Sequence, residues 1–194
     1  MRINTGIYKG RNLKMPMGIR PTQNMARKAI FDIIGDIEGL TFLELFAGSG
    51  AIGLEAASRG AKAVVFVENG SECIKVINDN ISLVRSSKIS QAHPKDYLVI
   101  RSDANEAVKQ LNRQKKVFDI IFLDPPYCKA DVEDSLTKKT LQTLSAYDIL
   151  PPTGLIIVQY SKKENLPEHL GVLNLLKLSV YGDTKISFYL KKSV

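Results

Sequence analysis

Residues 44–53 read Glu44-Leu45-Phe46-Ala47-Gly48-Ser49-Gly50-Ala51-Ile52-Gly53. The apolar run Thr41–Phe46 leads into them and predicts a strand, and Ala51–Ser58 has the pattern of a short helix. The three glycines fit G-x-G-x-x-G, in which glycine lets the backbone turn tightly and approach a ligand. A strand, a glycine turn and a helix in this order predict the first unit of a parallel α/β sheet, although the glycines alone would also suit a purely structural turn.

The same alternation continues along the chain. We expect further strands at Ala63–Glu68, Tyr97–Ser102, Phe118–Leu123 and Leu155–Tyr160, and helices at Ser71–Val84, Ala104–Leu111 and Leu136–Leu144. The strands Leu173–Val180 and Lys185–Leu190 close the chain as a hairpin around Tyr181-Gly182-Asp183-Thr184. The sequence therefore predicts an α/β fold with a Rossmann-like, doubly wound, seven-stranded sheet, mostly parallel with a C-terminal antiparallel hairpin.

The first 31 residues hold all of the excess positive charge. They contain seven Lys and Arg and no acidic residue, whereas from Asp32 onward 20 Lys and Arg balance 20 Asp and Glu. A basic segment beside a neutral body is typical of a polyphosphate partner, and a solvated arm is the alternative. The candidate residues for binding such a partner, a nucleic acid above all, are Arg2, Lys9, Arg11, Lys14, Arg20, Arg27 and Lys28.

This basic segment also has a predicted structure. Its glycines indicate a small β-hairpin extension with Lys9-Gly10 at the turn, followed by a loop and by a helix that Thr22 caps. We expect residues 1–194 to form a single domain, with a basic N-terminal extension over 1–31 and a catalytic core over 32–194.

The bulk properties exclude several classes of protein. The 194 residues are 44% hydrophobic and 24% charged, as in ordinary globular proteins. We expect no membrane span, because no apolar run approaches about 18 residues, and no secretory signal. Cys73 and Cys128 stand apart, as do His93 and His169, so we expect no metal site, free thiols and a cytoplasmic protein.

Acidic residues stand at the ends of the next two predicted strands. Glu68 lies 20 residues after Gly48, where an acid can accept hydrogen bonds from ribose hydroxyls. Asp103, in Ser102-Asp103-Ala104, could bind an adenine amine or cap its own helix. These residues favour a nucleoside cofactor, but nicotinamide dinucleotide and S-adenosylmethionine both carry adenosine and both remain open.

The fourth predicted strand ends at Asp124-Pro125-Pro126-Tyr127. The two prolines lack N–H groups, so they end the strand and hold the neighbouring carbonyl outward. A carboxylate, a carbonyl and an aromatic ring then stand together at a ligand-binding sheet edge, which suits a planar amine on a base. Because such an amine is a poor nucleophile, positioning and electrostatics must supply much of the rate.

At this point the chain resembles the RsmD family of class I methyltransferases. The resemblance is carried by Arg11, Arg20-Pro21-Thr22, Arg27–Phe31, Leu45–Ala61, Glu68, Asp103 and Asp124–Tyr127, and it spans nearly the whole chain. It implies transfer of a methyl group from S-adenosyl-L-methionine to the N2 amine of a guanine in small-subunit (16S) ribosomal RNA. It further implies a ribosomal RNA or small-subunit assembly particle as partner, and a monomer.

The resemblance also implies site residues. Asp124, Pro125, Pro126 and Tyr127 would be catalytic, and the cofactor would be bound by Arg20, Pro21, Thr22, Glu44, Phe46, Ala47, Gly48, Ser49, Gly50, Glu68, Asn69, Asp103, Ala104 and Asp124. Two positions depart from the family pattern: Glu44 replaces the usual Asp and Lys28 replaces a usual Glu. The first lengthens the side chain near the cofactor's methionine end, and the second removes or reverses a contact.

Four other functions compete with this interpretation. A nicotinamide oxidoreductase would explain the glycine turn but gives Asp124–Tyr127 no role. A methyltransferase acting on another RNA or DNA base shares the tetrapeptide, but a DNA enzyme normally needs an added recognition region. A glutamine methyltransferase usually has Asn in place of Asp124. An RNA-binding protein without turnover is the non-enzyme alternative.

Overall fold

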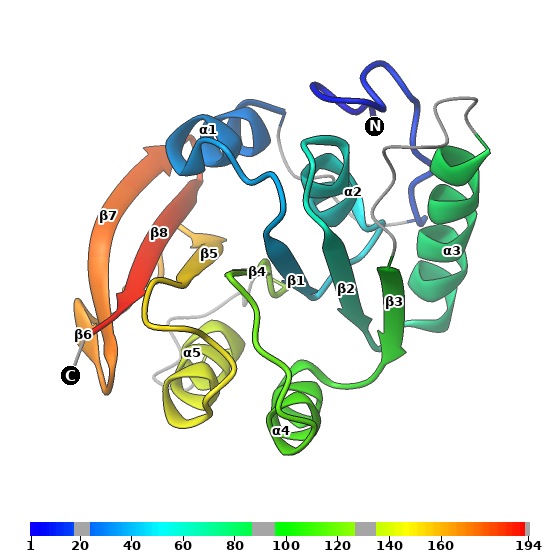
Figure 1. Ribbon diagram of the computed structural model, residues 1–194. Helices are drawn as coiled ribbons and strands as arrows, with labels where there is room; N and C mark the ends of the chain where they lie inside the picture. Colours follow the sequence, from blue (N-terminus) through cyan, green and yellow to red (C-terminus); the bar gives the residue numbers. More distant parts are fainter. Residues whose placement is uncertain (18–23, 87–95, 127–134, 193–194) are drawn as a thin grey trace.

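A computed structural model describes residues 1–17, 24–86, 96–126 and 135–192, and its elements form one mixed sheet flanked by helices (Figure 1). The elements are α1 (Asn24–Ile34), β1 (Thr41–Leu45), α2 (Ala51–Ser58), β2 (Ala63–Glu68), α3 (Ser71–Arg85), β3 (Asp96–Arg101), α4 (Ala104–Arg113), β4 (Ile120–Leu123), α5 (Leu136–Ala146), β5 (Leu155–Ser161), β6 (His169–Leu170), β7 (Leu173–Tyr181) and β8 (Thr184–Lys191).

The sheet confirms the predicted α/β class and corrects the strand number. Its order is β3-β2-β1-β4-β5-β8-β7-β6; the first five strands are parallel, and β8 runs antiparallel between β5 and β7. All seven predicted strands are present. An eighth, β6, has only two residues and pairs with the start of β7. Two residues are too few to show an alternating pattern, so no pattern in the sequence indicated β6.

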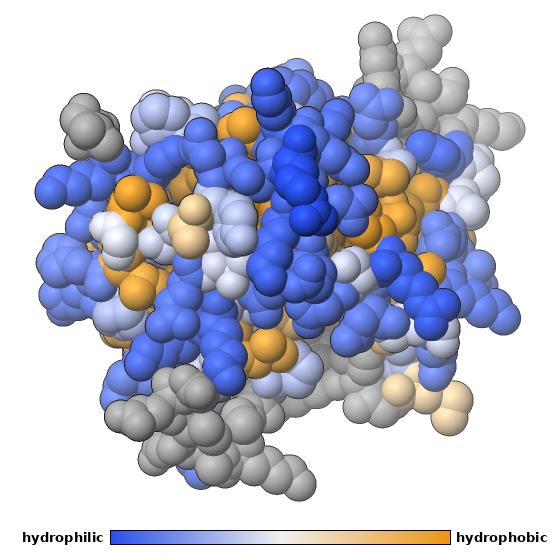
Figure 2. Space-filling model, turned by 90° about the horizontal axis from the view of Figure 1, so that it is seen from below, coloured by the Kyte–Doolittle hydropathy of each residue, from blue (hydrophilic) through white to orange (hydrophobic). Residues whose placement is uncertain are grey.

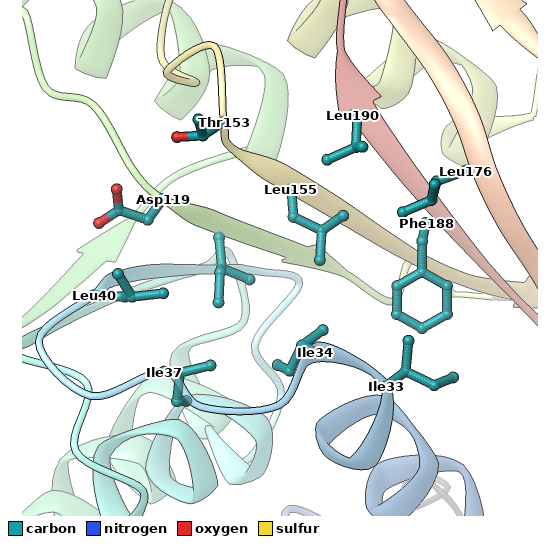
Figure 3. Close-up of a pocket in the computed structure, with 11 residues that line it drawn as sticks. Ile33, Ile34, Ile37, Leu40, Asp119, Thr153, Leu155, Leu176, Phe188 and Leu190 are labelled. Carbon is teal, nitrogen blue, oxygen red and sulfur yellow. The ribbon is translucent and has the colours of Figure 1, made fainter.

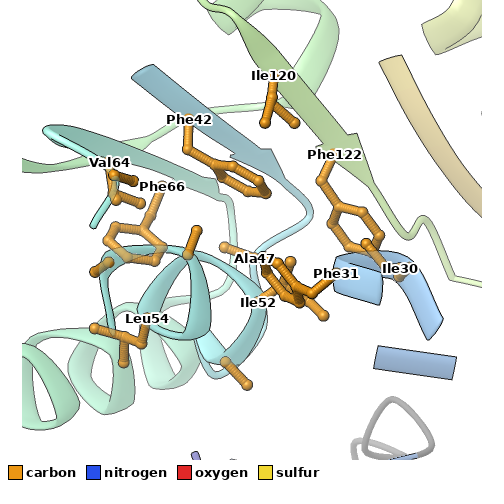
Figure 4. Close-up of a cluster of buried hydrophobic side chains, with 14 of the residues drawn as sticks. Ile30, Phe31, Phe42, Ala47, Ile52, Leu54, Val64, Phe66, Ile120 and Phe122 are labelled. Atoms are coloured by element: carbon orange, nitrogen blue, oxygen red, sulfur yellow. The ribbon is translucent and has the colours of Figure 1, made fainter. Parts of the chain in front are cut away.

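Helices cover both faces of the sheet, which explains why its central strands β1 and β4 are buried on both sides. The buried side chains of α1, α2 and α3 form one cluster with Phe42, Phe66 and Phe122, while those of α4 and α5 form a second cluster with Leu43 and Leu123 on the opposite face. Figure 4 shows the first cluster, in which aromatic rings from neighbouring strands point toward α2 and α1. Adjacent strand residues therefore serve opposite cores.

The N-terminal residues form an antiparallel hairpin with an isolated bridge between Arg2 and Asn12, but its turn covers residues 5–10 and is not confined to the predicted Lys9-Gly10. The amide of Ile3 donates to the Arg11 carbonyl at 3.0 Å, and the amide of Gly10 donates to the Ile3 carbonyl at 2.9 Å. The hairpin packs on α2, where the amide of Tyr8 donates to Ser58 Oγ at 2.9 Å. All eight residues of α2 are buried, because the sheet lies on one side of this helix and the hairpin contacts the other.

Charged side chains are buried beneath this hairpin. Glu55, on α2, is fully buried and accepts the amides of Asn4 at 2.8 Å and Thr5 at 3.0 Å. Arg59 donates to the same carboxylate at 3.2 Å. Arg27, on α1, is also fully buried and donates to Asn4 Oδ1 at 3.1 Å. The prediction that Arg27 contacts RNA is therefore wrong, because its guanidinium holds the hairpin inside the fold.

In the described parts of the chain, no helix is long and apolar enough to cross a membrane. The face seen in Figure 2 is mostly hydrophilic, with hydrophobic side chains in separate patches.

Candidate active site

The carboxyl ends of β1, β2, β3 and β4 meet at one edge of the sheet, and most predicted site residues stand there. The four strands are parallel neighbours, with Leu45 of β1 opposite Val67 of β2 and Leu123 of β4. The loops that follow these four strands therefore begin side by side. The fold thus brings together the glycine turn, Glu68, Asp103 and Asp124, which lie far apart in sequence.

The glycine turn after β1 has an unusual backbone. Phe46, Gly48 and Gly50 all have positive φ, at 58°, 54° and 72°. A phenylalanine in this region is strained by about 1–3 kcal/mol, and such strain clusters at functional sites. Gly50 is the N-cap of α2 and has no side chain to cap it. A Cβ added to Gly48 would meet nothing within 4 Å, so this part of the turn is uncovered.

Glu44 caps α2 from the neighbouring strand. Its carboxylate is 3% exposed and accepts the amides of Ile52 at 3.3 Å and Gly53 at 2.8 Å. These are free N–H groups of the first helical turn, which would otherwise be unsatisfied. Burial raises the pKa of Glu44 to about 8; the two amides lower it, and the charges of Asp124 and Glu68 raise it further. The Glu44 carboxyl group therefore stabilises the junction between the glycine turn and α2.

Glu68 ties the glycine turn to the start of α3. Its Oε2 accepts the Gly48 amide at 2.8 Å, and its Oε1 accepts the amides of Asn69 at 2.9 Å and Gly70 at 2.8 Å. Gly70 is the N-cap of α3. The carboxylate is half-buried and so remains accessible from one side. It is placed where the sequence predicts an acid for ribose hydroxyls.

Asp103 serves as the cap of α4. Its Oδ1 accepts the Asn105 amide at 2.8 Å and the Glu106 amide at 3.3 Å. The capping alternative for this residue is thus confirmed, and contact with an adenine stays a prediction. Asp103 is exposed beside the ends of β2 and β3, and Ala104 is buried as the first residue of α4.

Asp124 is held by a residue that the sequence did not indicate as functional. Gln159, on β5, donates from Nε2 to Asp124 Oδ2 at 2.7 Å and is only 4% exposed. Its Oε1 is buried and has no hydrogen-bond partner in the described part of the structure. The sequence did contain a sign of this role, because a glutamine inside the apolar run Leu155–Tyr160 is buried and buried polar groups need hydrogen-bond partners. Pro125 is buried and Pro126 is exposed.

The remaining predicted residues divide into two groups. Tyr127, Arg20, Pro21 and Thr22 lie outside the described residues. Among the cations of the basic segment, Arg2, Lys9, Lys14 and Lys28 are exposed and Arg11 is half-buried. Lys14 and Lys28 form surface ion pairs with Asp79 at 2.8 Å and Asp32 at 2.6 Å. Such exposed pairs are weak, about 0–1 kcal/mol, so both cations could exchange their partners for a phosphate.

A separate hollow lies at the opposite end of the strands. It has a volume of about 360 Å³, and Ile33, Ile34, Ile37, Leu155 and Phe188 are among the apolar side chains that line it (Figure 3). Asp119, its only charged side chain, bonds the Thr41 amide at 2.8 Å and the Thr41 hydroxyl at 2.7 Å. Its charge is thus already engaged, and the site chemistry described above lies at the other edge of the sheet.

Comparison with known proteins places this geometry in a family. The family model described as "Conserved hypothetical protein 95" matches residues 1–190. The chain belongs to this family. Its fold matches that of class I methyltransferase structures. One of these was solved with S-adenosylhomocysteine. It has a TM-score of 0.67 and 21% identity to this chain, and the match covers 94% of this chain and 52% of that chain.

Relatives with about a quarter to a third of their residues identical to this chain match most or all of its length. The chain is 33% identical over 195 residues to the Bacillus subtilis protein "Putative rRNA methyltransferase YlbH", covering 99% of this chain and 100% of the relative. It is 32% identical over 178 residues to "Ribosomal RNA small subunit methyltransferase D" of Haemophilus influenzae, covering 89% and 86%. The solved Escherichia coli structure of yhhF has a TM-score of 0.80 and 26% identity, covering 100% and 99%.

Proposed function

We propose that the protein transfers a methyl group from S-adenosyl-L-methionine to the N2 amine of a guanine in small-subunit ribosomal RNA. The observation that carries this proposal is the position of Asp124-Pro125-Pro126 directly beside the glycine turn, with the Asp124 carboxylate fixed by Gln159. The relatives named as ribosomal RNA methyltransferases support the substrate class.

The charge of the site supports a cationic cofactor over a dinucleotide. A pyrophosphate normally binds the free N–H groups at the start of the helix after the glycine turn. Here the amides of Ile52 and Gly53 already bind the Glu44 carboxylate. Asp124 and Glu68 add negative charge close enough to raise the pKa of Glu44. An anionic pyrophosphate would be repelled, whereas the sulfonium and ammonium groups of S-adenosylmethionine would be attracted.

The residues at the sheet edge fit that cofactor. The backbone at Gly48, which no described side chain covers, would admit its methionine part, Glu68 would accept hydrogen bonds from its ribose, and Asp103 would accept a hydrogen bond from its adenine amine. Arg20, Pro21 and Thr22 are proposed to bind the cofactor as well. The cofactor supplies an electrophilic methyl group.

The chain's own residues would then prepare the acceptor. The Asp124 carboxylate and the carbonyl at Pro125 accept the two hydrogens of the exocyclic amine and direct its lone pair, and Tyr127 stacks on the base. Gln159 keeps the carboxylate in one orientation. Good orientation of reacting groups alone can contribute roughly 7–11 kcal/mol. The guanine would be flipped out or presented unpaired, because the amine must attack perpendicular to the base plane and neighbouring bases cover that face within a stacked helix.

We place RNA binding in residues 1–31 and catalysis in 32–194 of a single cytoplasmic unit, acting as a monomer. Arg2, Lys9, Arg11, Lys14, Arg20 and Lys28 would contact phosphates, so RNA affinity should fall steeply with salt. Neutralising Arg11 should weaken RNA binding while cofactor affinity stays unchanged. An RNA affinity that ignores salt would contradict this role.

The deciding experiment is methyl transfer from labelled cofactor to total RNA and total DNA, followed by nucleoside analysis. N2-methylguanosine in RNA is the expected product, and N6-methyladenine in DNA would overturn the substrate assignment. Asp124→Ala should abolish transfer and leave cofactor binding largely intact. Asp148→Ala is the control, because Asp148 is a surface carboxylate paired with Lys191. An undiminished rate in Asp124→Ala would refute the catalytic assignment.

A further inference from the structure

Asn80 is a fully buried polar residue on α3. It lies on the helix face that carries Ile77 and Val84, both fully buried in the core. An apolar residue would be expected there, because an unpaired amide in such a position costs about 1–3 kcal/mol. Asn80 must therefore be retained for its hydrogen bonds.

Those hydrogen bonds connect two segments that are distant in sequence. Asn80 Oδ1 accepts the backbone amide of Lys14 at 2.8 Å, and Nδ2 donates to the Lys14 carbonyl at 3.1 Å. Nδ2 also donates to the Ser49 carbonyl at 3.0 Å. The orientation of the amide is fixed by its partners, since the two carbonyls require donors and the amide requires an acceptor. One side chain thus joins the basic segment to the glycine turn.

The path of the basic segment gives this contact its meaning. Beyond Lys14, whose Nζ pairs with Asp79, the chain reaches Met17, whose amide donates to Glu72 Oε1 at 3.3 Å. Glu72 is in the first turn of α3, next to Gly70 and Glu68. The segment therefore follows α3 from its middle back to the sheet edge that holds the candidate active site.

The hairpin before this segment is anchored elsewhere. Asn4 and Thr5 bond Glu55, and Tyr8 bonds Ser58, both on α2. Loss of Asn80 would leave those bonds in place. Asn80 hydrogen-bonds both Lys14 and Ser49, and it makes no bond to the hairpin among the described residues. Its loss should therefore release residues 14–17 without releasing the hairpin.

We propose that Asn80 is a positioning residue that aligns the RNA-binding segment with the cofactor turn. This proposal rests on the proposed function of that edge. Asn80 touches neither reacting group; it acts through the backbones of Lys14 and Ser49. Its loss should therefore weaken binding of both RNA and cofactor, and should change the rate at saturation much less.

The test compares Asn80→Asp with Asn80→Ala and with Val84→Ala. Asn80→Asp keeps the shape and the acceptor for the Lys14 amide, but it removes both donated bonds and places an oxygen against two carbonyls. Val84→Ala is the matched control, because Val84 is equally buried one turn further along α3 and removes only packing. If alignment of the two segments contributes about 1.4 kcal/mol to binding, its loss lowers affinity tenfold.

Three measurements distinguish positioning from stability. In both Asn80 variants the KM for RNA and the Kd for S-adenosylhomocysteine, measured by calorimetry, should rise about tenfold or more, while kcat changes less than about threefold. Amide hydrogen exchange in Asn80→Ala should quicken at Lys14 and stay slow at Tyr8. Val84→Ala should lower the melting temperature without these changes. Asn80→Asp should resemble Asn80→Ala despite its matching shape.

The outcomes separate this proposal from the proposed function. If Asn80→Asp binds RNA and S-adenosylhomocysteine as the wild type does, or if Tyr8 and Lys14 lose protection together, Asn80 has no positioning role. If wild-type protein binds S-adenosylhomocysteine but methylates no RNA, the substrate assignment fails, while the cofactor Kd and the exchange at Lys14 still decide the role of Asn80.

Discussion

Gly53→Ala should destabilise the protein, although alanine is the better helix former. Inside an exposed helix this exchange would stabilise by about 1 kcal/mol. At Gly53, in α2, the added Cβ would lie 2.5 Å from Phe66 Cε1, 2.7 Å from Glu44 Oε2 and 2.8 Å from Val64 Cγ1. Phe66 and Val64 are fully buried, and Glu44 is held by its bonds to the helix. Since none can move freely, overpacking should cost about 1–3 kcal/mol.

Urea unfolding and thermal melting measure this cost. For a chain of this length about 1 kcal/mol lowers the melting temperature by roughly 2–4 °C, so the expected fall is about 2–12 °C. Cofactor affinity should fall as well, because Glu44 would be pushed away from the Gly53 amide. Gly70→Ala is the control: its added Cβ would come no closer than 3.3 Å to any atom. A Gly53→Ala protein that melts at or above the wild-type temperature would refute the close packing of α2 on β2.

Three further substitutions test separate parts of the site. Gln159→Leu should lower kcat by about tenfold or more with an unchanged Kd for S-adenosylhomocysteine, because Asp124 loses the donor that orients it; equal kcat would remove Gln159 from the mechanism. Glu44→Gln should flatten the pH dependence of the free energy of unfolding. The pKa of Glu44 is about 8 in the folded protein and 4.5 in the unfolded chain. The wild-type protein is therefore most stable at low pH, and this contribution to stability is lost as the pH rises through about 8, by at most about 1.4 kcal/mol per pH unit. Denaturant titrations at pH 5.5 and pH 8 measure that slope, and equal slopes in both proteins would contradict burial of an ionisable Glu44. Glu55→Gln should lower the free energy of unfolding by about 3–5 kcal/mol and expose residues 1–13 to protease, since Arg59 loses its buried partner. A protease-resistant hairpin and an unchanged melting temperature would contradict the role of Glu55 in anchoring the hairpin.

Hydrophobic periodicity predicted the fold because each element buries one or two faces. The helix Ala51–Ser58 and the strand Ala63–Glu68 have the predicted bounds, and the C-terminal hairpin turns where the sequence placed it. The prediction for β4 began two residues early. Its first strand residue is Ile120, because Asp119 turns to bond Thr41. A polar contact 78 residues away in sequence, which no local pattern shows, sets that boundary.

The sequence predicted the position of Glu68 and Asp124 at the carboxyl edge of the sheet, because each acid stands at the end of an apolar strand. The site was not predictable where a polar side chain works inside the fold. Arg27, Asn80 and Gln159 each stand among apolar residues on a buried face, and this was the available signal. Periodicity shows that such a residue is buried, but it cannot show which distant group the residue binds. Arg27 was therefore assigned by its charge to the surface, where the structure does not place it.

The helix α2 makes stability and function hard to separate in this protein. Its first turn is held by Glu44 beside the glycine turn, and its last turns hold the N-terminal hairpin through Glu55 and Ser58. All eight residues of α2 are buried between these two contacts, so a substitution inside α2 disturbs the glycine turn and the basic N-terminal segment together. Asn80 lies outside α2 and touches both segments by side-chain hydrogen bonds alone. Its variants can therefore loosen the alignment of the two segments while α2 keeps its packing, which substitutions in α2 itself cannot do.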